Sequence, residues 1–260
     1  MQDMLKIDGL TIRFGGLVAV NELRFQIKEG SLAGLIGPNG SGKTTVLNSI
    51  SGIYRPTSGN IFFYDRQIGG KKPHQVAKIG IGRTFQNNQV FKSMSVLENV
   101  MVGYHHCMHS SVFSPVFGFS YARKEERETE LKARELLDFL GLAHLESKMV
   151  DSLAYGQQKQ VEIARALIGS PKLMLLDEPA AGLNPFEKLE LEKLIANINS
   201  RGITVLMVEH DMKMVMRLCR HVVVLNFGKK IAEGSPQSIS QNPEVIKAYL
   251  GEEDSIVRGQ

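Results

Sequence analysis

The chain has 260 residues and a mass of 28.8 kDa, which suits one compact domain with an inserted subdomain, or two small domains. Its apolar content of 43% and charged content of 22% are ordinary for a globular protein with a sizeable buried core. The net charge of +4 is too mild to argue for nucleic-acid binding, and we expect no nucleic-acid partner.

Cysteine usage and hydropathy bear on the compartment. Cys107 and Cys219 are the only cysteines and do not have the spacing of a disulfide framework, so a reducing compartment is expected. The N-terminus has no basic segment followed by an apolar run, as a secretory signal would. No stretch approaches the ~18 consecutive apolar residues that a membrane-spanning helix needs. These features predict a location in the cytoplasm.

The first part of the chain predicts mainly strands. Residues 1–30 alternate polar and apolar positions, which indicates strands of an antiparallel, half-exposed sheet. Residues 31–37 form an apolar strand that runs into a glycine loop, and residues 44–52 continue as a helix that ends at a glycine. Two more short strands are predicted at 59–65 (GNIFFYD) and 78–85 (KIGIGRTF).

The pattern becomes helical from about residue 93 to 168. Two strongly apolar strands follow at 172–179 (KLMLLDEP) and 202–210 (GITVLMVEH), with a helix at 185–200 between them. Residues 221–234 predict a hairpin, and a last short helix is expected at 242–253 (NPEVIKAYLGEE).

Apolar strands that alternate with amphipathic helices predict an α/β fold with a mostly parallel sheet covered on both faces. The helical block interrupts this alternation, so it is interpreted as an inserted helical subdomain beside an N-terminal antiparallel β subdomain. We expect a single domain over residues 1–260. Its predicted parts are a nucleotide-binding core with the β subdomain (1–92 and 169–235), the helical subdomain (93–168) and a C-terminal tail (236–260).

The glycine loop fits the pattern G-x-x-x-x-G-K-[ST] between a predicted strand and a predicted helix. Glycines let the backbone fold around phosphates, so that amide N–H groups point inward, and the helix N-terminus adds partial positive charge. Lys43 is expected to reach the β- and γ-phosphates, and the Thr44 hydroxyl to ligate Mg²⁺. The predicted nucleotide-binding residues here are Gly37, Pro38, Asn39, Gly40, Ser41, Gly42, Lys43, Thr44 and Thr45. The pattern therefore predicts nucleoside triphosphate binding; the alternative is a structural glycine turn.

Two carboxylates stand where a buried parallel strand ends, the usual edge for a ligand site in such sheets. Asp177 is predicted to hold Mg²⁺ through water, and Glu178 to orient or deprotonate the attacking water. The alternative is a solvated acidic turn. His210 ends the other apolar strand, so it should reach the same rim, where a neutral imidazole could sense the γ-phosphate or serve the structure alone.

Two further candidates have weaker signals. Gln86 follows a predicted strand, where an amide could complete the Mg²⁺ shell or hold the water, or could simply be solvated. Phe14 lies on a strand of the first sheet, where its ring could stack on adenine or belong to the core. Periodicity does not separate these alternatives.

Residues 153–158 read LAYGQQ, a glycine turn before a long helical pattern, which is typical of a helix start that holds an anion. The motifs together resemble the ATP-binding subunit of an ABC transporter along the whole chain. In order they are Phe14, the loop at 37–45, Gln86, the turn at 153–157, Asp177 with Glu178, and His210. The resemblance implies ATP and Mg²⁺ as cofactors, and Glu178, His210 and Gln86 as catalytic residues.

The resemblance also implies a head-to-tail pair of ATPase domains. Each ATP then lies between the phosphate loop of one domain and the glycine turn of the other, here Ala154, Tyr155, Gly156 and Gln157. The family pattern is LSGGQ, so Ala154 removes a hydroxyl that usually contacts the γ-phosphate. After the carboxylate pair, Asn184 stands where the family has an aspartate, which drops a charge but keeps the hydrogen-bonding shape.

Several segments are similar to the branch that serves branched-chain amino acid import: LAYGQQ, EPAAGLNP, IGRTFQN, VEHDMKMVM and VIKAYLGEE. Importers of urea or short amides are related and stay open as alternatives. The implied partners are integral-membrane permease subunits and a second ATPase subunit, either an identical copy or a close paralogue. A solute-binding protein would be only an indirect partner. The implied location is peripheral, on the cytoplasmic face of the plasma membrane.

Two other classes compete with this interpretation. A non-transport ABC ATPase, acting in DNA repair or on ribosomes, usually carries long coiled-coil insertions or two fused ATPase domains, which this chain lacks. A phosphate-loop kinase or GTPase would leave LAYGQQ and His210 without a purpose. An importer subunit is therefore the favoured function.

The stretch 104–128 combines possible metal ligands, an apolar run and a charged run. His105, His106, Cys107 and His109 are possible zinc ligands, but no second cluster matches them, so a metal site is not expected. The apolar run at 112–119 could contact membrane subunits or lipid headgroups, and packing on the helical block is the favoured alternative. The charged run at 123–135 predicts a solvated helix face.

Overall fold

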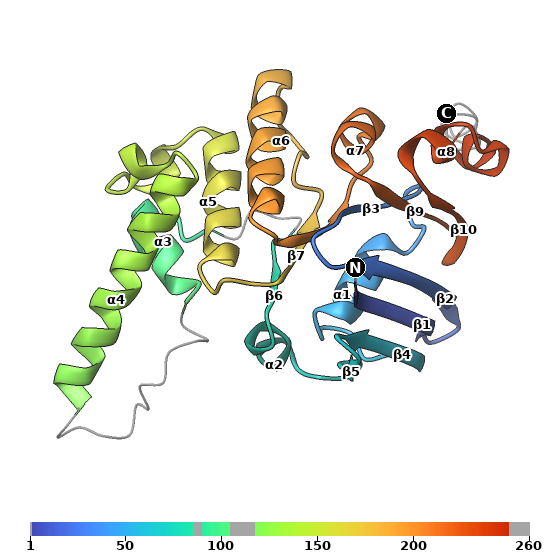
Figure 1. Cartoon of the computed structure of the whole chain (residues 1–260), viewed down its shortest axis with the longest axis horizontal. Helices are drawn as coiled ribbons and strands as arrows, with labels where there is room; N and C mark the ends of the chain where they lie inside the picture. The colour runs from blue at the N-terminus through green and yellow to red at the C-terminus, as the bar shows by residue number, and fades with distance from the viewer. Residues whose placement is uncertain (1, 86–89, 105–117, 250–260) are drawn as a thin grey trace.

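The computed structural model describes residues 2–85, 90–104 and 118–249, and it contains two β-sheets with helices around them (Figure 1). The first sheet consists of β1 (Asp3–Phe14), β2 (Leu17–Lys28), β4 (Ser58–Phe63) and β5 (Arg66–Gln67) in the order β2-β1-β4-β5. β1 pairs antiparallel with both β2 and β4. The antiparallel sheet expected near the N-terminus is present.

The second sheet is mostly parallel. Its strands are β3 (Leu32–Ile36), β6 (Ile81–Arg83), β7 (Leu173–Asp177), β8 (Thr204–Val208), β9 (His221–Asn226) and β10 (Lys229–Gly234). The strand order is β10-β9-β3-β8-β7-β6, and only β10 runs antiparallel to its neighbour. With its antiparallel companion sheet, it confirms the expected α/β class.

Both faces of the central strands β3, β7 and β8 are buried, which explains why these strands are almost entirely apolar. Leu173 and Leu175 of β7 pack with the four-stranded sheet and with α1 (Lys43–Ile50), which forms one core. Met174 and Leu176 point to the opposite face and pack in a second core with helices. This alternation follows from the strand period of two residues.

The second core is formed by helices together with the other face of the sheet. The helices are α3 (Val96–Val102), α4 (Gly118–Phe139), α5 (Tyr155–Leu167), α6 (Pro185–Ser200) and α7 (Met212–Leu218). Figure 1 shows α3, α4 and α5 grouped at one end of the molecule, with the four-stranded sheet towards the other end. Short 3-10 helices, η2 (Ala143–Leu145) and η3 (Val150–Ser152), connect α4 to α5.

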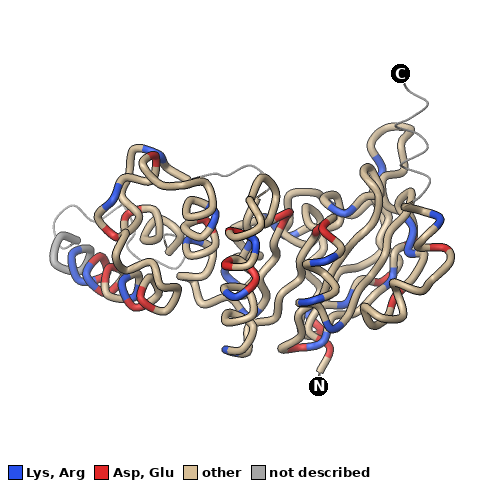
Figure 2. Tube along the Cα trace, turned by 90° about the horizontal axis from the view of Figure 1, so that it is seen from above, with Lys and Arg blue, Asp and Glu red and all other residues tan. Residues whose placement is uncertain are grey.

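Helix α4 carries its charges on an exposed face. Figure 2 shows lysines and arginines interspersed with acidic residues along this helix. Arg134 pairs with Glu130 at 3.0 Å, one helical turn away, while Ala133 and Leu137 are buried in the second core. The predicted solvated face is therefore confirmed for the described side chains from residue 123 onward. The histidines and cysteine at 105–109 lie outside the described residues.

Short helices were missing from the sequence interpretation. They are α2 (Pro73–Lys78), α7 and α8 (Pro236–Ser240). Each has five to seven residues, which is too short for a helical period to stand out. Residues 243–249 are helical, in agreement with the predicted last helix. None of the helices in the described ranges combines the length and the apolar character that a membrane crossing requires.

Candidate functional site

The phosphate loop connects β3 to α1, and two of its positions accept only glycine. Gly37 has φ +149°, and a Cβ there would lie 2.1 Å from the Leu225 carbonyl oxygen. Gly42 has φ +103°, and its Cβ would lie 2.6 Å from the Ala19 carbonyl oxygen. Both contacts are far shorter than any real Cβ makes, so the loop depends on glycine for space as well as for conformation.

Lys43 closes the loop from inside. Its side chain is 5% exposed, and Nζ donates to the carbonyl oxygens of Gly37 and Pro38 at 2.7 and 2.8 Å. Ser41 Oγ is also buried and has no hydrogen-bond partner within the described ranges. A cation beside an unsatisfied buried hydroxyl makes this loop a natural cradle for an anion.

A cleft of about 490 Å³ opens beside the loop. Its lining residues are Phe14, Leu17, Val18, Ala19, Asn39, Gly40, Gly42, Lys43, Thr44, Thr45, Glu178, Phe227 and Gly228. The lining combines polar groups of the loop and Glu178 with the apolar side chains of Phe14, Leu17, Val18 and Phe227. Phe14 is 45% exposed and packs edge-on against Tyr54 with ring centroids 5.1 Å apart. Its ring is therefore on the rim of the cleft rather than in the core.

Asp177 ends β7 behind the cleft and is 1% exposed. Its Oδ2 accepts a hydrogen bond from Arg83 on the neighbouring strand β6 at 3.0 Å. Its Oδ1 is buried without a hydrogen-bond partner among the described residues. Burial raises the pKa of Asp177, and the Arg83 guanidinium opposes that shift. The unsatisfied oxygen marks where a further ligand, such as a metal-bound water, would be accommodated.

Glu178 and His210 come together because β7 and β8 are neighbours in register. Asp177 pairs with Val208, and the Glu178 N–H donates to the Val208 carbonyl at 2.9 Å. Glu178 has φ +48°, an uncommon conformation that turns its side chain towards the cleft. His210 Nδ1 lies 3.9 Å from Glu178 Oε1, with the histidine side chain 55% exposed. The sequence prediction that these residues share one rim is therefore correct.

Glu209 is a buried carboxylate that the sequence interpretation missed. It is 1% exposed, and its Oε1 accepts from the Ala180 N–H at 2.8 Å while Oε2 accepts from the His210 N–H at 3.2 Å. Burial raises the pKa of Glu209, and the hydrogen bond from Ala180 opposes the shift. Glu209 thus ties the segment after Glu178 to the backbone of His210.

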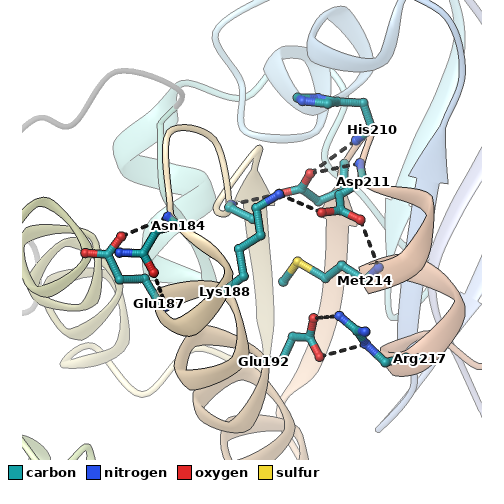
Figure 3. A network of polar contacts seen from close by, with 10 residues as sticks. Asn184, Glu187, Lys188, Glu192, His210, Asp211, Met214 and Arg217 are labelled. Atoms are coloured by element: carbon teal, nitrogen blue, oxygen red, sulfur yellow. Dashed lines mark hydrogen bonds and ion pairs between the residues drawn. The ribbon is translucent and has the colours of Figure 1, made fainter.

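Ion pairs fix α6 against α7, as Figure 3 shows. Lys188 Nζ donates to Asp211 Oδ2 at 2.7 Å, and Asp211 Oδ1 accepts from the Met214 N–H at 3.2 Å, which caps α7. The bond from Lys188 lowers the pKa of Asp211. Arg217 and Glu192 form a second pair further along the same two helices. Both neighbours of His210, Glu209 and Asp211, therefore have fixed partners, and these hold the backbone that carries the histidine.

The LAYGQQ turn starts α5, with Ala154 at the N-cap and no side-chain oxygen there to accept from the first-turn N–H groups. The Tyr155 ring packs on Gly182, where a Cβ would lie 3.1 Å from its edge. Gly156 lies against Glu187, since a Cβ would come within 2.8 Å of Oε1. The turn is therefore packed on the start of α6 rather than on the phosphate loop.

Asn184 is the N-cap of α6. Its Oδ1 accepts from the Glu187 N–H at 3.0 Å, and Glu187 Oε2 accepts from the Asn184 N–H at 3.0 Å. This reciprocal arrangement is a capping box, and the pattern Asn-Pro-x-Glu in the sequence carries its signal. Asn184 thus has a structural role as a helix cap, which the sequence analysis had not identified when it noted that the family has an aspartate at this position.

The predicted site residues fall into two groups. Phe14, the phosphate loop and Glu178 line or border one cleft, with His210 beside Glu178 and Asp177 behind it. Residues 154–157 do not line that cleft. Gln86 lies outside the described residues. Arg83 and Phe227 were also missed, because nothing in the sequence separates them from an ordinary strand cation and an ordinary turn residue.

Residues 20–181 match the protein-family model described as ABC transporter. The chain belongs to the ABC transporter family. Residues 229–255 also match the model described as branched-chain amino acid ATP-binding cassette transporter. The family and the branch expected from the motifs are therefore confirmed, and so is the enzyme class, an ATPase that powers transport.

Curated ABC transporter proteins cover nearly the whole chain. It is 44% identical to the high-affinity branched-chain amino acid transport ATP-binding protein BraF of Pseudomonas aeruginosa, over 96% of this chain and 98% of that protein. It is 42% identical to LivG of Escherichia coli, which has the same description, over 96% and 99% of the two chains. The lipopolysaccharide export system ATP-binding protein LptB of Acidithiobacillus ferridurans is 36% identical, over 98% and 100%.

Solved ABC transporter cassettes have the same fold. The ADP conformation of MJ1267 superimposes with a TM-score of 0.84 at 33% identity, over 96% of this chain and 100% of that one. A dimeric post-hydrolysis cassette, MJ0796 bound to ADP and Pi, gives a TM-score of 0.74 at 26% identity, over 90% and 99%. Nucleotide binding is common to these cassettes, and ABC ATPases work with membrane permease subunits and dimerise.

Proposed function

We propose that this chain is the ATP-binding and ATP-hydrolysing subunit of a membrane importer, which works as a head-to-tail dimer and powers the uptake of branched-chain amino acids. One observation in particular supports the dimer. The phosphate loop and Glu178 line a single cleft, whereas the LAYGQQ turn lies elsewhere, against α6. A second copy or a close paralogue must bring its own turn to this cleft.

The nucleotide-binding residues are those of the phosphate loop, with Phe14 against the adenine ring. Lys43 and the loop amides hold the β- and γ-phosphates, and the partner's α5 N-terminus covers the γ-phosphate. The donor set fits Mg²⁺ because Asp177 Oδ1 is a buried oxygen without a partner in the described ranges, and Thr44 supplies a hydroxyl at the cleft. Thr44, Asp177 and Gln86 would hold the ion, which supplies charge neutralisation on the phosphates when bound.

Hydrolysis is assigned to the carboxylate that faces the cleft. Glu178 accepts a proton from the attacking water or orients it, and its orientation is set by the bond from its own N–H to Val208. His210 contacts the γ-phosphate from the same rim, and Gln86 is proposed to position the water. Loss of the γ-phosphate removes the anion that joins the two subunits, so they separate after each turnover.

The proposed cargo rests on similarity. BraF and LivG are named as branched-chain amino acid transport proteins and exceed 40% identity to this chain, above the 36% of a lipopolysaccharide export protein. The model matched at 229–255 supports the same branch. Solute contacts belong to other chains of the transporter. Transport of branched-chain amino acids must therefore be tested against transport of urea and short amides.

The proposed partners are permease subunits, which this chain joins at the cytoplasmic face of the plasma membrane as a peripheral subunit. A cavity of about 370 Å³ lies where α2, β6 and α5 meet, and Phe85, the residue before Gln86 in the sequence, is in its lining. Its lining includes Ile53, Val76, Phe85 and Pro171, a mostly apolar set suited to an inserted side chain. We propose this cavity as the permease contact, with the helical subdomain at 93–168 moving against the core at 1–92 and 169–235.

The Phe14→Ala variant is expected to weaken ATP binding about tenfold, because stacking on an aromatic face contributes roughly 1–3 kcal/mol per base. The ring lines the cleft, is 45% exposed and lies outside the phosphate loop, so its removal should leave the loop intact. Titration with a fluorescent ATP analogue measures the change. Tyr54→Ala is the matched control, since Tyr54 supports Phe14 from behind and should cost less.

Transport is tested by affinity purification of the tagged chain from native membranes, followed by reconstitution of the complex in vesicles. The expected result is co-purification of integral-membrane subunits and ATP-driven accumulation of radiolabelled leucine. A complex that transports urea or acetamide instead of leucine would overturn the cargo. A chain that hydrolyses ATP but retains no membrane subunit, with the tag at either end, would overturn the importer and favour a non-transport ATPase.

A further inference from the structure

A buried arginine contacts one of the proposed magnesium ligands, Asp177. Arg83 is on the edge strand β6, and its side chain is 7% exposed although edge strands usually leave cations in solvent. Its NH2 group donates to Asp177 Oδ2 at 3.0 Å, and its NH1 group donates to Ser51 Oγ at 2.6 Å. The guanidinium is thus held at two points, one of which is a proposed metal ligand.

Ser51 anchors this arginine to the helix that follows the phosphate loop. It is the C-cap residue of α1, and its Oγ in turn donates to the Leu47 carbonyl at 2.9 Å. The Arg83 side chain also lies over the Phe85 ring, with its carbon Cζ 4.9 Å from the ring centroid. These contacts leave the guanidinium little freedom, so the position of Asp177 Oδ2 is fixed relative to α1.

The other carboxylate oxygen is in the opposite situation. Asp177 Oδ1 is buried and has no hydrogen-bond partner within the described ranges. The Asp177 N–H donates to Thr84 Oγ1 at 3.4 Å, so Arg83 of β6 engages Asp177 at Oδ2 and the residue after that strand engages its backbone. A carboxylate with one oxygen clamped and one left unsatisfied is oriented to offer a single oxygen to a ligand.

We infer that Arg83 is a positioning residue for magnesium: it clamps Oδ2 of Asp177 so that Oδ1 alone faces the metal-bound water. The inference rests on the proposed function, since it presupposes the magnesium site. It goes beyond that function because Arg83 is not among the residues that line the nucleotide cleft and would act through Asp177. Residues that orient a metal ligand in this way typically change metal affinity by 10–100-fold when they are removed.

The test measures the magnesium requirement of nucleotide binding, without turnover, in the Glu178→Gln background. Arg83→Met keeps the length of the side chain and removes its charge and its donors. The expected result is a rise of about 10–100-fold in the Mg²⁺ concentration at half-saturation, with affinity for fluorescent ATP in EDTA unchanged within about twofold. Arg83→Lys should recover part of the loss, because it restores the charge but not the two-point geometry.

A double variant separates positioning from general damage. Since Arg83 acts through Asp177, the Arg83→Met/Asp177→Asn protein should need no more Mg²⁺ than Asp177→Asn alone. This protein also lacks an uncompensated buried carboxylate, so it remains informative if Arg83→Met fails to fold. Arg24→Met is the matched control, because Arg24 forms an exposed pair with Asp8 at 3.6 Å in the other sheet.

The outcomes are distinguishable. An unchanged Mg²⁺ requirement in Arg83→Met, or losses that add in the double variant, would overturn the positioning role and leave the proposed function intact. An equal loss of nucleotide affinity with and without Mg²⁺ would also overturn it. If the parent protein itself binds ATP with no dependence on Mg²⁺, the proposed magnesium site fails, and the inference about Arg83 fails with it.

Discussion

The Glu178→Gln variant is expected to lower ATP turnover by about a thousandfold while nucleotide affinity stays within about twofold, because a general base contributes roughly 10²–10⁴-fold and an amide cannot accept the proton. Glutamine has nearly the same shape, so the contact with the cleft is retained. Glu178 lines the same cleft as Lys43 and Thr44, and the glutamine keeps both of its side-chain positions able to accept or donate a hydrogen bond there. Phosphate release measures turnover, and fluorescent ATP measures binding.

The same variant should also trap the dimer. With ATP uncleaved, the γ-phosphate keeps joining the loop of one subunit to the α5 turn of the other, and gel filtration with ATP and Mg²⁺ should give dimers. Glu22→Gln is the matched control, because Glu22 has the same φ of +48° but lies on β2, outside the cleft. Retained turnover in Glu178→Gln would remove this residue from its role, and persistent monomers would contradict the shared site.

Much of the fold was predictable because burial leaves a direct pattern in the sequence. The strand Leu173–Asp177 is apolar at consecutive positions, since one face meets α1 and the other meets the helices. The helix Pro185–Ser200 was predicted with the bounds observed, and the structure adds that Asn184 and Glu187 form the capping box at its start. Both signals are local, so a single sequence suffices.

The candidate site was predicted only where motif spacing encodes it. The positions of Gly37, Gly42 and Lys43 follow from the geometry of a phosphate cradle. Arg83 and Glu209 were missed because their roles depend on partners 94 and 29 residues away, which no spacing rule connects. Phe14 was left undecided because rim and core positions of a strand have the same period, and the structure identifies it as a rim residue.

The Gly156→Asp variant is expected to reduce turnover about a hundredfold, equivalent to roughly 2.7 kcal/mol of transition-state stabilisation, while each isolated chain still binds ATP. Gly156 is outside the chain's own cleft, so binding at the phosphate loop should not change. The aspartate would place a negative charge at the α5 N-terminus, which is proposed to meet the partner's γ-phosphate. Its Cβ would also press on Glu187 Oε1, 2.8 Å away.

Gly156→Ala and Gly202→Asp serve as controls for this variant. Gly156→Ala adds the bulk without the charge and should lose less activity. Gly202→Asp repeats the substitution in a turn with nothing within 4 Å, where the φ of +86° adds backbone strain, so it also bounds the effect of general destabilisation. Mixing Gly156→Asp with Lys43→Ala subunits tests directly whether two subunits complete one ATP site together. Half of the dimers then contain one intact site, so turnover should recover to roughly a quarter of the parent level. Mixed dimers without recovery would contradict a site that two subunits complete for each other.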